Sequence, residues 1–70
     1  MNSIDRFIIE GTRNNIDDVL KRQGEIVGAL INETDPKIIK KLRDCYIQWS
    51  NVLIDYSKTL NRYLKQVEVQ

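Results

Sequence analysis

Glu33-Thr34-Asp35-Pro36 is the one stretch of this 70-residue sequence that is plainly unsuited to a helix interior. Asp35 is a favoured helix N-cap, and Pro36 suits the first helical position because its missing N–H would have no partner there. A short link between two helices makes them antiparallel neighbours. The stretch therefore predicts an all-α hairpin within a single domain. The expected bounds, within a domain of residues 1–70, are a helix over about 3–33, a turn at 34–35 and a helix over about 36–67.

Two rows of side chains with heptad spacing run along the first predicted helix. The rows are Ile9, Ile16, Gln23, Leu30 and Thr12, Val19, Ile26, Glu33. This spacing is typical of a coiled-coil-like seam, in which one helix packs against another. Gln23 is a polar residue at the middle of the seam, where such a residue fixes the register of the helices at some cost in stability.

The second predicted helix carries a wider apolar stripe. Its two seam rows are Leu42, Trp49, Tyr56, Tyr63 and Ile39, Tyr46, Leu53, Leu60, Val67, and the stripe is widened by Ile38, Cys45, Val52 and Leu64. A two-stranded seam needs only the two rows. The extra width predicts contact with more than one partner helix, as in a four-helix bundle.

A turn at 34–35 also predicts which residues meet across the hairpin. Gln23 is expected opposite Tyr46, whose hydroxyl would satisfy the side-chain amide. Gly24 and Gly28 are expected beside Tyr46 and Leu42, so that small residues oppose large ones.

Two helices side by side cannot enclose a core, and chains of this size usually need a disulfide, a metal or a partner chain. Cys45 is the only cysteine and there is no histidine, so an internal disulfide and the usual zinc ligand sets are absent. We therefore expect a homodimer that forms a four-helix bundle; the alternative is a marginal monomer that folds on a larger partner. The residues expected at the contact between two copies are Gly24, Gly28, Cys45, Trp49, Val52, Tyr56 and Tyr63.

Signatures of catalysis and of cofactor binding are missing from the sequence. It has no Gly-rich phosphate loop, no Ser/His/Asp set and no Cys/His pair. Asp17 and Asp18 are adjacent, and neighbours on a helix point about 100° apart, so their carboxylates do not converge on one proton. We expect no enzymatic activity, no cofactor and no metal.

The expected location is the cytoplasm. A lone cysteine fits a reducing compartment, and no apolar run is long enough to span a membrane. The first ten residues include acidic and polar side chains and lack the basic region of a secretory signal. Short helical chains without catalytic residues are common among phage and plasmid products, and size alone suggests that origin.

Charge is unevenly divided although the net charge is only +1. Residues 1–35 hold four basic and seven acidic side chains, and residues 36–70 hold seven basic and three acidic ones, which gives about −3 and +4. The opposite signs favour pairing of the two antiparallel helices. The alternative is a basic face on the second helix, whose first turns carry Lys37, Lys40 and Lys41 where the helix dipole disfavours cations.

These features predict a non-enzymatic protein–protein interaction module: a small helical regulator, inhibitor or assembly factor that acts as a homodimer on another protein. Ile47 and Ile54 lie seven apart, off the stripe, and are either isolated exposed residues or a second interface. The alternative function is a dimeric helical hairpin that binds RNA through the basic face. The residues expected to bind a partner are Lys37, Lys40, Lys41, Arg43, Ile47 and Ile54.

Overall fold

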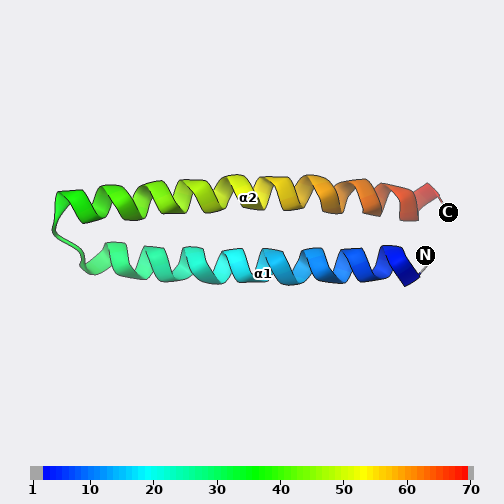
Figure 1. Ribbon diagram of the computed structural model, residues 1–70, viewed down its shortest axis with the longest axis horizontal. Helices are drawn as coiled ribbons and strands as arrows, with labels where there is room; N and C mark the ends of the chain where they lie inside the picture. The colour runs from blue at the N-terminus through cyan, green and yellow to red at the C-terminus, as the bar shows by residue number, and fades with distance from the viewer. Residues whose placement is uncertain (1–2, 70) are drawn as a thin grey trace.

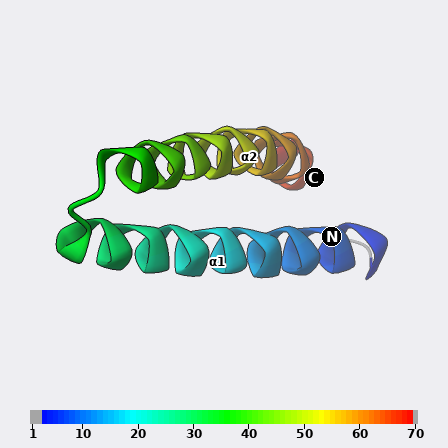
Figure 2. The ribbon, with the colours of Figure 1, turned by 60° about the vertical axis from the view of Figure 1, so that its left-hand side comes forward.

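Two long antiparallel helices joined by a three-residue turn make up the fold (Figure 1). The computed structural model describes residues 3–69, and the side chains of residues 3–66. Helix α1 spans Ser3–Asn32 and helix α2 spans Pro36–Val69. Figure 2 shows that α2 runs at an angle to α1, as expected when side chains of two helices interdigitate. The hairpin predicted from the sequence is confirmed.

The turn is built by two carboxylates that accept hydrogen bonds from backbone N–H groups. Asp35 Oδ1 accepts from Lys37 N at 2.9 Å, and the Asp35 carbonyl accepts from Ile39 N at 2.9 Å, so Asp35 is the N-cap of α2. Glu33 Oε1 accepts from Thr34 N at 3.1 Å and from Asp35 N at 3.0 Å. Helix α1 therefore ends one residue before the predicted end, because Glu33 belongs to the turn.

The seam of the hairpin follows the heptad rows. Every row residue of α1 is buried or half-buried, as is Glu33 in the turn, and the least exposed are Val19 (3%), Thr12 (7%) and Gln23 (7%). On α2 the described row residues are half-buried except Tyr46, which is exposed; the side chain of Val67 lies outside the described residues. Among the side chains of residues 3–66, Val19 is the only buried apolar one. Two helices alone thus produce a seam and not an enclosed core.

Gln23 sets the register by reaching across the seam to α2. Its Nε2 donates to Ser50 Oγ at 2.8 Å and to the Tyr46 carbonyl at 3.3 Å. The predicted pairing of Gln23 with Tyr46 is confirmed, but the expected hydroxyl partner is wrong. Ser50 lies one helical turn beyond Tyr46, so its hydroxyl and the Tyr46 carbonyl come within reach of the same amide.

Gly24 and Gly28 do not pack against bulky residues of α2, so that prediction is wrong within one chain. Both are exposed, and a Cβ built on either would meet no atom of the described residues within 4 Å. Gly24 follows the seam residue Gln23 by one position, which turns it about 100° away from α2. Gly28 lies two positions before Leu30 and faces still farther away.

Candidate interaction surfaces

The exposed apolar side chains of the hairpin are concentrated on one of its two long faces. Helical geometry defines these faces: residues directly after a seam residue lie about 100° round their helix. Because the helices are antiparallel, these residues on α1 and on α2 fall on the same side of the seam, and those directly before a seam residue fall on the other. Residues 3–66 have ten large exposed hydrophobic side chains, of which six belong to the first side.

We call the first side the isoleucine face. Each member directly follows a seam residue. Its members are Leu20 (51% exposed), Val27 (44%) and Ile31 (77%) on α1, and Ile47 (51%), Ile54 (52%) and Leu64 (42%) on α2. The bond from Gln23 to the Tyr46 carbonyl places Gly24 and Ile47 at about the same level on this face.

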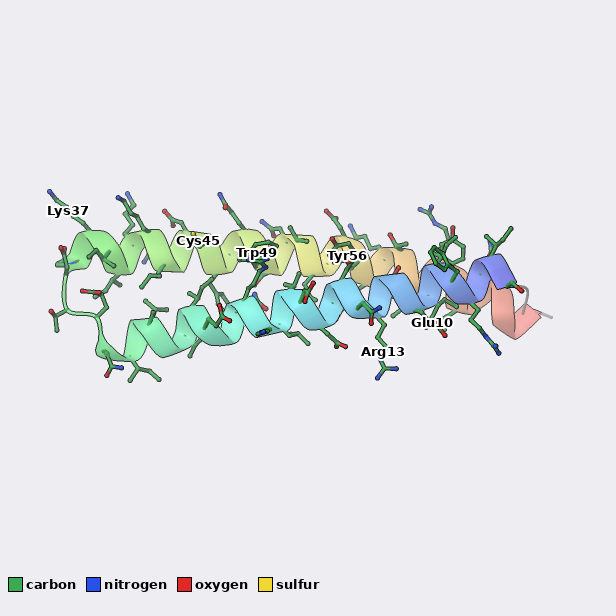
Figure 3. All side chains as sticks on the ribbon, turned by 60° about the horizontal axis from the view of Figure 1, so that its bottom comes forward. Glu10, Arg13, Lys37, Cys45, Trp49 and Tyr56 are labelled. Atoms are coloured by element: carbon green, nitrogen blue, oxygen red, sulfur yellow. The ribbon has the colours of Figure 1, made fainter. Side chains whose placement is uncertain are left out.

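The opposite side carries a solvent-open groove between the helices, and we call it the groove face. The Arg22 guanidinium carbon lies 5.2 Å from the centre of the Trp49 ring, which projects from α2 towards α1 (Figure 3). Arg22 is exposed, and a cation over an indole at an exposed site contributes about 0.5–1 kcal/mol. The groove has a volume of about 270 Å³ and is lined by Arg22, Glu25, Ile26, Ala29, Leu42, Cys45 and Trp49.

The basic residues of α2 near the turn do not gather on one face. Lys37, Lys40, Lys41 and Arg43 are all exposed, and Figure 3 shows Lys37 pointing away from the body of the hairpin. Lys40 and Arg43 directly follow seam residues and belong to the side of the isoleucine face, whereas Lys41 directly precedes one and belongs to the groove face. The four cations therefore surround the closed end of the hairpin.

The residues expected to join two copies are also distributed over several surfaces. Trp49, Tyr56 and Tyr63 are half-buried in the seam of their own hairpin, while Val52 and the exposed Cys45 belong to the groove face. Gly24 lies on the isoleucine face. Gly28 lies on the back of α1, away from both faces.

Three apolar residues of α1 were missed by the sequence reasoning as surface candidates. Leu20, Val27 and Ile31 belong to the isoleucine face together with Ile47 and Ile54. A signal for them was available, because each directly follows a seam residue, as both isoleucines of α2 do. Ile47 and Ile54 therefore lie on the same side of the seam as these three exposed residues of α1.

Within the described residues, no group of three His, Cys, Asp or Glu side chains is placed to hold a metal ion. No helix in that part of the chain is long and apolar enough to cross a membrane. Comparison with known proteins gave no match to a family model, to a curated protein or to a solved structure.

Proposed function

We propose that this chain is a non-enzymatic protein–protein interaction module, a small regulator, inhibitor or assembly factor whose hairpin dimerises into a four-helix bundle. The observation that supports the proposal is the amount of exposed surface. One hairpin exposes 5722 Å². A folded monomer of 8.2 kDa is expected to expose about 4,500 Å² from the scaling of surface with mass. The excess is therefore about 1,200 Å² for each chain.

An excess of this size is comparable with what a specific interface covers. A standard protein–protein interface buries about 800 Å² on each partner, and obligate homodimers bury more. The burial of Val19 alone among the described apolar side chains gives little hydrophobic stabilisation within one chain. Association of two hairpins would bury the exposed apolar side chains and supply the missing part of the core.

A protein is favoured over nucleic acid as the further partner. The net charge of +1 gives little general attraction to phosphate, and the cations surround the closed end without forming a continuous stripe. Trp49 and Tyr56 are half-buried in the seam, whereas base stacking needs exposed rings. We place contacts to the protein partner at the closed end, around Lys40 and Lys41.

Sedimentation equilibrium tests the dimer. The proposal predicts a mass of twice the 8.2 kDa of one chain at micromolar concentration. A stably folded species with the mass of one chain would contradict it.

Affinity capture with the tagged chain tests the partner class. We expect a host protein to be retained by the native chain and lost from Lys40→Glu/Lys41→Glu. Lys58→Glu/Lys65→Glu, which carries the same charge change near the other end of α2, should still retain it. RNA binding at low salt that requires Lys40 and Lys41, with no protein retained, would replace this proposal with the RNA-binding alternative.

A further inference from the structure

We propose that the isoleucine face is the surface on which the second copy docks, and that Gly24 of each chain receives Ile47 of the other. This inference rests on the proposed dimer and adds which face is used and how the copies are oriented. The occupant is a second copy of this chain, related by a twofold axis parallel to the helices.

The distribution of exposed apolar side chains separates the two faces. Six of the ten large exposed hydrophobics among residues 3–66 belong to the isoleucine face. On the groove face, only Ile4 and Ile38 are of this kind. There the outer rim carries Asp18 and Glu25, which are exposed, and the Arg22 guanidinium already covers the Trp49 ring. Charged side chains also border the isoleucine face, because Lys40 and Arg43 lie on its side of the seam. The distribution of the exposed apolar side chains is therefore what favours the isoleucine face.

The extent of the apolar patch suits a bundle of four helices. Leu20 to Ile31 covers about 17 Å of α1 at 1.5 Å per residue. On the adjacent helix, the bonds from Gln23 to Tyr46 and Ser50 place Ile47 at about the level of Gly24, while Ile54 lies two turns farther on, beyond the level of Leu20. The patch therefore crosses both helices, and covering it uses part of the excess surface of about 1,200 Å² on each chain.

Gly24 and Ile47 make the face complementary to itself. A Cβ at Gly24 would meet no described atom within 4 Å, so the backbone of α1 is open at the middle of the patch, while Ile47 projects at the same level from α2. A twofold axis parallel to the helices places α1 of one copy over α2 of the other without changing the level along the axis. Ile47 then meets Gly24 of the second copy, twice in each dimer, and every helix lies antiparallel to its neighbours.

The test measures the dissociation constant of the dimer by sedimentation equilibrium, with helix content followed by circular dichroism. Ile47→Asp should raise the dissociation constant at least about tenfold. Each copy would lose the burial of one isoleucine in the dimer and would bury a carboxylate in its place. Ile38→Asp, the same change at a comparably exposed residue of the groove face, should leave it within about twofold. A dimer weakened by Ile38→Asp and unchanged by Ile47→Asp would overturn the assignment of the face.

The glycines provide a second test that does not depend on the tolerance of the hairpin for a charge. Gly24→Leu should weaken the dimer at least about tenfold, whereas Gly11→Leu, at an equally open glycine on the other side of α1, should not. Adding Ile47→Ala to Gly24→Leu should restore most of the affinity, since it reopens the space that the leucine needs. An unchanged constant for Gly24→Leu, or the absence of rescue, would overturn the proposed contact, whereas a native chain that is monomeric would overturn the dimer itself.

Discussion

The hydrogen bond from Gln23 to Ser50 gives a quantitative prediction for the hairpin. Ser50→Ala removes the 2.8 Å acceptor and leaves the Gln23 amide only the longer, 3.3 Å bond to the Tyr46 carbonyl. Gln23 is 7% exposed, so water replaces the lost partner poorly. A hydrogen bond of this kind contributes about 1 kcal/mol net, and we expect the free energy of unfolding to fall by about that amount.

Gln23→Leu has the opposite expected effect on the same seam. The leucine loses both hydrogen bonds but places an apolar side chain at a buried position, and neither partner is stranded. The Tyr46 carbonyl keeps its place in the hydrogen bonding of α2, and Ser50 is only half-buried. Full burial of a leucine contributes about 1.5–3 kcal/mol, against about 1 kcal/mol for each lost bond, so stability should be unchanged or higher by about 1 kcal/mol.

A double-mutant cycle isolates the bond itself. In the Gln23→Leu background, Ser50→Ala should cost less than about 0.3 kcal/mol, which gives a coupling energy near 1 kcal/mol between positions 23 and 50. The assay is urea unfolding followed by circular dichroism at one fixed chain concentration, since the proposed association would make the midpoint depend on concentration. Equal costs for Ser50→Ala in both backgrounds would show that the bond does not stabilise the hairpin.

Three further substitutions test the turn, α1 and the groove face. Asp35→Ala removes the N-cap of α2 and should lower the free energy of unfolding by about 1 kcal/mol. The control Asp44→Ala, inside the same helix, should change this free energy far less, and equal effects of the two substitutions would refute the cap. Gly28→Ala should raise the free energy of unfolding, measured in urea, by up to about 1 kcal/mol, because alanine favours a helix and the added Cβ meets open space. A loss of stability would mean that a second chain packs against Gly28. Arg22→Gln should cost about 0.5 kcal/mol and alter the fluorescence of Trp49, and an unchanged emission spectrum would argue against the cation over the ring.

The hairpin and its seam were predictable because two independent signals agree in the sequence. The heptad rows place Val19 and Gln23 towards the other helix, and the pair Asp35-Pro36 starts α2 at a defined residue. The end of α1 was less certain from the pattern, because Glu33 occupies a seam position and its carboxylate also suits a turn. The local hydrogen bonds to Thr34 and Asp35 decide for the turn.

The exposed faces were harder to predict. The width of the apolar stripe on α2 does not show on which side of the seam each flanking residue lies. Cys45 and Leu64 both widen the stripe of α2, yet they border opposite faces of the hairpin. Ser50 is polar and lies outside the heptad rows, so the apolar periodicity could not predict its hydrogen bond to Gln23. The glycine spacing suggested close packing, but a spacing of four residues does not say towards which neighbour Gly24 is turned.

We propose that one hairpin leaves its core incomplete and that a second copy completes it. The most direct measurement is the urea midpoint of unfolding over a range of about 100-fold in chain concentration, because a partner that binds only the folded state stabilises it by mass action. We predict that the midpoint rises steadily with concentration. A cooperative transition whose midpoint does not change over that range would show that the single hairpin is stable by itself and would contradict the claim.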